Sequence, residues 1–303
     1  MSLLVNRNGS LNGTELSQGL GGRKHVLSAG SSADEYVVKV QAEHFDSTKK
    51  PFMESALVEN LIIDGKGYNI PGILLDNVCN CQIRNVTIRN CDVGIHIRSS
   101  DGLWSETNCL KHIRMENVTK GIVFTTTGPY IDPQNPGNQE IQKRRPGDSA
   151  GFTTIDDVGI KLADNRSGTV GIQVGGTQMS GDVNNKLILP YSSRIRANVW
   201  MSASDGVGLK VINGRLSYAQ AHLTVHKTGV IGGIGVDLQQ VNTGVVADKP
   251  IWQNQFSKMD DSLFDGELVN DTRGFMLVTS NVLEPIRNPA NFKTDIKTKT
   301  FSS

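Results

Sequence analysis

The sequence has no long apolar run and few aromatic residues. No stretch of 18 consecutive apolar residues occurs among its 303 residues, so we expect no membrane-spanning helix. Hydrophobic residues make up 37% of the chain and aromatic residues 6%, which is low for a compact globule with one large core. The segment from Met1 to Gly9 lacks a basic stretch followed by a long apolar one, so we expect no classical signal peptide there.

Neither sign of charge dominates, and cysteine is scarce. Lys and Arg total 31 and Asp and Glu total 30, so a net charge of +1 gives no global field that would attract nucleic acid or an anionic membrane. Cys79 and Cys81 are too close for the usual zinc knuckle, and neither the remaining Cys91 and Cys109 nor a histidine pair completes one. We therefore expect reduced, buried thiols, with no metal, no cofactor, no nucleic-acid partner and no membrane insertion.

What the sequence does contain is a short repeated pattern of glycine, an apolar residue, any residue and a second apolar residue. A strand fragment that recurs at intervals of tens of residues indicates a solenoid. The function of a solenoid usually lies on its long lateral face, in the loops that vary from coil to coil. The eight copies begin at Gly72, Gly94, Gly121, Gly159, Gly171, Gly208, Gly235 and Gly274.

Three consecutive stretches align with one another, at residues 57–77, 82–99 and 109–125. Apolar and polar residues alternate within each strand, which gives one inward and one outward face. Such strands can stack in parallel on their equivalents in the next coil, about 4.8 Å apart. The sets that fall together are Asn60, Asn85 and His112; Val58, Ile83 and Leu110; Ile63, Ile88 and Met115; Ile73, Ile95 and Ile122; and Leu75, Ile97 and Phe124.

These patterns predict an all-β, single-stranded parallel β-helix with long lateral loops. A β-sandwich would need regular hairpin turns, and a leucine-rich repeat would need a Leu-x-x-Leu-x-Leu signature that is absent. We place an N-terminal connector or cap at residues 1–35, the β-helix at 36–284 and a tail at 285–303. The repeat is interrupted by a loop of about 30 residues after Phe124 and by an irregular stretch from Gln178 to Met201.

The stretch from Asn60 to Phe124 resembles the pectin-lyase-type right-handed parallel β-helix superfamily. The segment Asp101-Gly-Leu-Trp-Ser-Glu-Thr-Asn108, which leads into His112 and Gly121, is similar to tail-spike and tail-fibre proteins of viruses that infect prokaryotes. This resemblance implies a homotrimer, a location on the virion or outside the cell, and a polysaccharide or surface glycan as the partner.

Glycoside hydrolysis needs two carboxylates on one face, and neighbouring coils can supply them. The candidate catalytic residues are Glu106, Asp101, Asp156 and Asp157, and the candidate glycan-binding residues are Trp104, Tyr130, Arg144, Arg145 and Trp200. The structural alternative for Trp104 is that its ring fills the inside of the coil. For Glu106, Asp156 and Asp157 it is a solvent-exposed turn, and for Arg144 and Arg145 it is a solvent-exposed loop. A polygalacturonase-like Gly-His-Gly is absent, and the calcium-binding acid cluster of a pectate lyase cannot be assembled.

Three functions therefore stay open. The first is a tail-spike-type or tail-fibre-type protein that binds, and in some cases degrades, a host-surface polysaccharide. The second is a polysaccharide lyase or glycoside hydrolase of the pectinase-like class. The third is a purely structural component of a virion.

Overall fold

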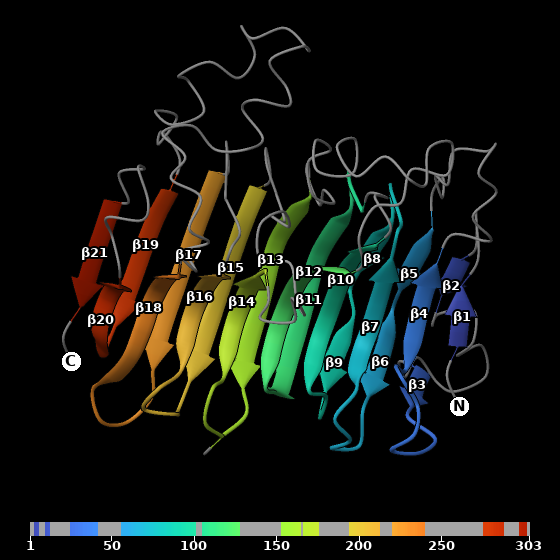
Figure 1. Cartoon of the computed structure of the whole chain (residues 1–303), viewed down its shortest axis with the longest axis horizontal. Helices are drawn as coiled ribbons and strands as arrows, with labels where there is room; N and C mark the ends of the chain where they lie inside the picture. The colour runs from blue at the N-terminus through green and yellow to red at the C-terminus, as the bar shows by residue number, and fades with distance from the viewer. Residues whose placement is uncertain are drawn as a thin grey trace, which may run out of the picture.

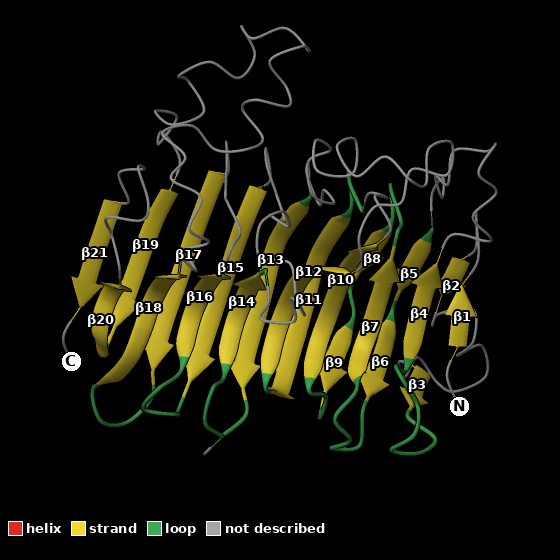
Figure 2. Ribbon diagram, in the orientation of Figure 1, coloured by secondary structure: helices red, strands yellow, loops and turns green. Residues whose placement is uncertain are grey.

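The described residues of the chain form only strands and connecting turns. The computed structural model describes residues 3–5, 10–12, 25–41, 56–100, 105–127, 153–164, 166–175, 194–212, 220–239, 275–287 and 297–301. Figures 1 and 2 show two layers of strands that follow one another from the N-terminus to the C-terminus along the long axis. The prediction of an all-β chain is confirmed. This part of the chain contains no helix long and apolar enough to cross a membrane.

Sheet A has nine strands, in the order in which they occur in the chain. Each strand pairs in parallel with its neighbours. Its strands are β1 (Leu3–Val5), β4 (Val38–Gln41), β7 (Pro71–Asp76), β10 (Val93–Ser100), β12 (Lys120–Thr127), β14 (Val170–Val174), β16 (Val207–Ile212), β18 (Gly232–Gln239) and β20 (Val282–Arg287).

Sheet B has twelve strands, and these also pair only in parallel. Its main path consists of β2 (Ser10–Asn12), β5 (Leu57–Glu59), β8 (Gln82–Arg84), β11 (Cys109–Val118), β13 (Thr154–Leu162), β15 (Arg194–Met201), β17 (Gln220–Lys227), β19 (Phe275–Ser280) and β21 (Lys297–Phe301). A branch of three short strands, β3 (His25–Ser28), β6 (Leu61–Asp64) and β9 (Thr87–Arg89), joins the path at β11.

From β10 onward the chain passes alternately between the two sheets, and equivalent side chains stack on one another. Ile95 is in register with Ile73 on one side and with Ile122 on the other, and all three are fully buried. The predicted stacking of these residues is confirmed. Most of the core is one continuous column of mainly aliphatic side chains between the sheets, as expected for strands with one apolar face, and Val170, Val207 and Ile234 form a small second cluster.

A column of residues in the left-handed conformation marks the corner between the short strands of sheet B. Asn60, Asn85, His112 and Asp157 have φ values of 59°, 54°, 54° and 52°. Asparagine tolerates this region because its short polar side chain bonds locally. The amide of Asn85 donates to Oδ1 of Asn60 at 2.6 Å. The third and fourth positions of the column hold a histidine and an aspartate instead.

The repeated glycines lie where the two sheets come closest. Glycines 72, 94, 121, 171, 208 and 235 all lie in sheet A. A Cβ on Gly94 would lie 2.5 Å from Sδ of Met115, which projects inward from sheet B, and 2.7 Å from the carbonyl oxygen of Gly121. Glycine is therefore required by close approach. Two of the eight copies lie elsewhere in the fold, because Gly159 lies in sheet B and the copy that begins at Gly274 continues into β19 of sheet B.

Strands at both ends of the chain continue the same sheets. The strands β1, β2 and β3 precede residue 36, and β20 and β21 extend the two sheets near the C-terminus. The boundaries at residues 35 and 285 remain predictions. The prediction that the irregular stretch extends to Met201 was wrong, because residues 194–201 form β15, in which every second side chain is buried.

All four cysteines are free, and Cys79, Cys81 and Cys91 are buried. The prediction of thiols without disulfide bonds is confirmed, whereas burial holds for three of the four, because Cys109 is half-buried. Burial raises the pKa of Cys81 and of Cys91 to about 12, so both thiols stay protonated and unreactive at neutral pH.

Candidate functional site

The outer face of sheet B carries acidic, basic and aromatic side chains on adjacent strands. A bulge in β13 presents two of the acidic ones. Ile155 pairs with Ile195 and Val158 with Ala197, so Asp156 and Asp157 together lie opposite a single residue of β15. Both aspartates are partly exposed, whereas the isoleucine and valine beside them are fully buried. The extra residue thus turns two consecutive carboxylates toward the outer face.

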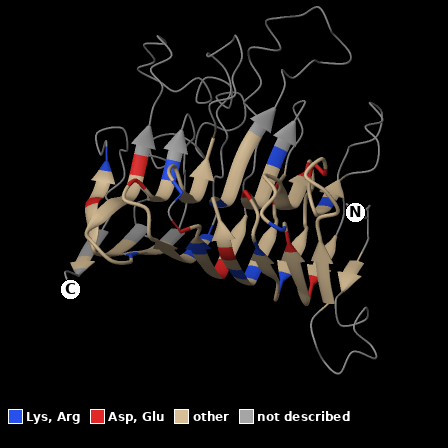
Figure 3. Cartoon of the chain, turned by 90° about the horizontal axis from the view of Figure 1, so that it is seen from below, with Lys and Arg blue, Asp and Glu red and all other residues tan. Residues whose placement is uncertain are grey.

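Each of these two carboxylates contacts basic side chains of a neighbouring strand. Nε of Arg196 lies 2.7 Å from Oδ1 of Asp156. Nδ1 of His112 lies 2.7 Å from Oδ2 of Asp157, and Nη1 of Arg114 lies 3.8 Å from Oδ1 of the same residue. We call these five residues the acid–base cluster. Figure 3 shows that both signs of charge are interspersed along the described strands, in line with the net charge of +1.

Trp200 lies next to this cluster, on β15. It is 39% exposed, which is high for so large an apolar side chain. A Cβ on Gly159 would lie 2.9 Å from Nη1 of Arg114 and 3.4 Å from Cζ3 of Trp200. The side chains of Arg114 and Trp200 therefore both extend over the backbone of this outward-facing glycine. The result is an exposed aromatic ring beside paired carboxylates and cations.

The charges around Asp157 suit its carboxylate to accept hydrogen bonds and not to donate a proton. The hydrogen bond from His112 and the nearby charge of Arg114 hold the pKa of Asp157 below its ordinary value. Its carboxylate is therefore ionised at neutral pH. An ionised carboxylate accepts hydrogen bonds from hydroxyl groups but cannot act as the general acid of a glycosidase.

The structure brings together three of the nine predicted site residues. Asp156, Asp157 and Trp200 share the outer face of sheet B, on β13 and β15. Glu106 lies elsewhere, in the turn before β11, where its backbone N–H donates to Sγ of Cys79 at 3.5 Å. The predicted residues that lie outside the described part of the chain are Asp101, Trp104, Tyr130, Arg144 and Arg145.

Sequence reasoning did not assign His112, Arg114 or Arg196 to a site. A signal existed for His112, because it occupies the register position of Asn60 and Asn85, where asparagine is the expected residue. Its contact with Asp157 spans 45 residues of sequence and depends on the register between β11 and β13.

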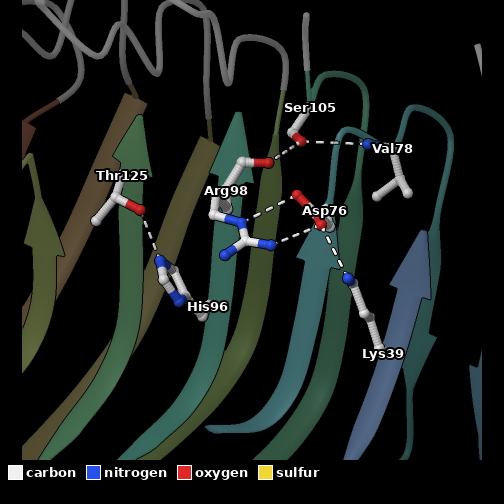
Figure 4. A network of polar contacts seen from close by, with 7 residues as sticks. All are labelled: Lys39, Asp76, Val78, His96, Arg98, Ser105 and Thr125. Carbon is white, nitrogen blue, oxygen red and sulfur yellow. Dashed lines mark hydrogen bonds and ion pairs between the residues drawn. The ribbon is translucent and has the colours of Figure 1, made fainter. Parts of the chain in front are cut away.

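A second polar network lies on the outer face of sheet A (Figure 4). Asp76 is 4% exposed, and it accepts hydrogen bonds from Nε and Nη2 of Arg98 at 3.0 and 2.7 Å. Nζ of Lys39 lies 3.2 Å from the same carboxylate. Burial by itself raises the pKa of Asp76, but the hydrogen bonds and charges of Arg98 and Lys39 outweigh burial, so the net shift is downward.

His96 lies beside this network, and its Nε2 is 2.6 Å from Oγ1 of Thr125. Burial, together with the positive charge of Arg98, lowers the pKa of His96 to about 4, so the imidazole is neutral at pH 7. The groups in this network satisfy one another. We therefore assign the network to stability, whereas the cluster on sheet B is exposed and open to a ligand.

No three His, Cys, Asp or Glu side chains are grouped in the described ranges so as to hold a metal ion. Comparisons of the chain with protein-family models, with curated proteins and with solved structures found no match. The function is therefore argued from the residues of this chain.

Proposed function

We propose that this chain is a right-handed parallel β-helix of the tail-spike or tail-fibre type, and that it binds a host-surface polysaccharide through the outer face of sheet B. The observation on which the proposal rests is the exposed ring of Trp200 beside the paired carboxylates and cations of the acid–base cluster. An aromatic ring offers an apolar surface of defined geometry for the C–H face of a sugar. Carboxylates and guanidinium groups supply acceptors and donors for its hydroxyl groups.

The parallel pairing of all described strands supports the β-helical part of the proposal. The placement on a virion and the assembly into a homotrimer follow from the resemblance of residues 60–124 and of the segment at 101–108 to viral tail proteins. Binding is favoured over hydrolysis, because Asp156 and Asp157 are adjacent on one strand and a guanidinium group lies beside each of them.

Cleavage by elimination is the second candidate, and one observation favours it. Asp157 orients the imidazole of His112, and Arg114 supplies a cation beside it. A positioned imidazole can remove a proton, and a nearby cation can stabilise the charge that develops. An assay for unsaturated products over a panel of acidic polysaccharides tests this candidate.

Replacement of Trp200 tests the binding proposal directly. A glycan array identifies a ligand for the wild-type chain, and calorimetry then gives its affinity for each variant. We expect Trp200→Ala to weaken binding about tenfold or more, because stacking on an aromatic ring contributes about 1 kcal/mol beyond the buried area. Trp200→Phe should retain most of the affinity.

Leu283 provides the matched control. It is 72% exposed and lies on β20 of sheet A, away from the proposed surface. Leu283→Ala should bind as the wild type does. Equal affinity of the wild type and Trp200→Ala for the array ligand would exclude this face as the binding surface.

A further inference from the structure

A surface cavity lies among the turns that lead from sheet B to sheet A. Its volume is about 710 Å³, and it is formed by the turns that follow β13, β15 and β17. These turns stack on one another as the strands do. Its lining includes Arg166, Ser202, Asp205, Lys227, Val230 and Ile231.

Lys227 is the most unusual residue in this cavity. It is the last residue of β17 and is in register with the buried Met201, so a charged side chain continues a column of core side chains. It is only 4% exposed. Its ammonium donates to the carbonyl oxygen of Thr228 at 2.7 Å and forms no ion pair with a described carboxylate. An ammonium has three donors, and burial of an unpaired charge is costly.

The acidic residue in the cavity does not neutralise this charge. Oδ2 of Asp205 accepts hydrogen bonds from the hydroxyl of Ser167 at 2.5 Å and from the backbone N–H of Gly168 at 3.0 Å. The hydrogen bond from Ser167 is the main reason that the pKa of Asp205 lies below its ordinary value. Asp205 therefore links the turn after β15 to the turn after β13 through hydrogen bonds.

Two further donors line the same cavity. The hydroxyl of Ser202 is buried and has no hydrogen-bond partner. Arg166 is exposed, and its Nη1 donates to Oγ1 of Thr119 at 3.0 Å, which leaves other guanidinium donors for a ligand. A buried polar group without a partner normally indicates a missing ligand or solvent molecule.

We propose that this cavity binds a small anion through Lys227, Ser202 and Arg166. The ligand presents carboxylate or phosphate oxygens, which accept hydrogen bonds from an ammonium, a hydroxyl and a guanidinium. Val230 and Ile231 are 86% and 58% exposed, and they offer an apolar wall for the body of the ligand. The lining of this cavity includes neither Trp200 nor any residue of the acid–base cluster, so anion binding here can be tested independently of the proposed glycan binding.

The proposal is tested by thermal unfolding of the full chain with sodium phosphate, sodium glucuronate, glucose or sodium chloride, at matched ionic strength. A ligand at one hundred times its Kd should raise the midpoint by about 5 °C. Phosphate and glucuronate should do so, whereas glucose and chloride should not. The anion that binds with the lower Kd shows whether the natural ligand bears a phosphate or is an acidic sugar.

Lys227→Met removes the charge and keeps the length of the side chain. Because a methionine stacks well on Met201, the variant should unfold at a higher temperature than the wild type without ligand, and it should lose the anion-dependent shift. Ser202→Ala should weaken anion binding about fivefold. Lys66→Met is the control, because Lys66 is an exposed turn residue outside the cavity. The proposal is overturned if neither anion stabilises the wild type, or if Lys227→Met responds as the wild type does.

Discussion

Gly171→Ala should lower the free energy of unfolding by about 3 kcal/mol. A Cβ at this position would lie 2.5 Å from the carbonyl oxygen of Gly208 and 2.6 Å from Cγ2 of Val199. The first obstacle is backbone of the neighbouring strand β16 in sheet A, and the second is a buried side chain of sheet B, so the methyl group must displace β16 or separate the two sheets. Intrinsic propensity alone predicts the opposite sign, because glycine in a strand costs conformational entropy relative to alanine.

Urea unfolding at equilibrium measures this effect, and Gly232→Ala is the matched control. Gly232 also lies in sheet A, but a Cβ there would be 3.4 Å from its nearest neighbours, an ordinary contact distance. The control should change stability by less than about 0.5 kcal/mol. If Gly171→Ala is as stable as the wild type, the sheets do not approach each other as closely as described.

Lowering the pH from 7 to 4.5 should remove about 2.5 kcal/mol of stability through His96 alone. The pKa of His96 is about 4 in the folded chain, below its value of 6.5 in the unfolded chain. The unfolded state therefore binds the proton first. The stability is fully present above pH 6.5 and is lost as the pH falls toward 4. Burial is the main obstacle to protonation of His96, Arg98 and Lys120 also oppose it, and Asp76 favours it.

A series of urea titrations between pH 7 and 4.5 tests this expectation. His96→Gln keeps a nitrogen near Oγ1 of Thr125 but does not titrate. Between pH 7 and 4.5 its free energy of unfolding should therefore fall by about 2.5 kcal/mol less than that of the wild type. Asp76 adds its own loss only below about pH 3.8, since its pKa is lowered. A wild-type slope in His96→Gln would disprove the burial of the neutral imidazole.

Much of the architecture could be predicted from the sequence because the strand period is strictly two. Alternation placed Ile73, Ile95 and Ile122 on one face, and a parallel stack then fixed their contacts. The strand β15 was not predicted, although it alternates as strictly as the others. It lies in sheet B and has no leading glycine, because glycine is needed only on the side where sheet A meets the inward side chains of sheet B.

The candidate site was predictable only in part, for a physical reason. Asp156 and Asp157 stand out in the sequence as an adjacent pair, and Trp200 stands out as one of three tryptophans. The partners His112 and Arg196 come from strands about 40 residues away in either direction. Only the register between parallel strands brings them together, and that register depends on a bulge that composition does not reveal.

The fluorescence of Trp200 tests most directly whether the outer face of sheet B is the ligand-binding face. The chain has tryptophans at positions 104, 200 and 252, so a Trp104→Phe/Trp252→Phe variant reports on Trp200 alone. Titration with the polysaccharide identified on the array should shift its emission to the blue and saturate at the Kd that calorimetry gives. Unchanged emission while calorimetry records full binding would place the ligand on another part of the molecule.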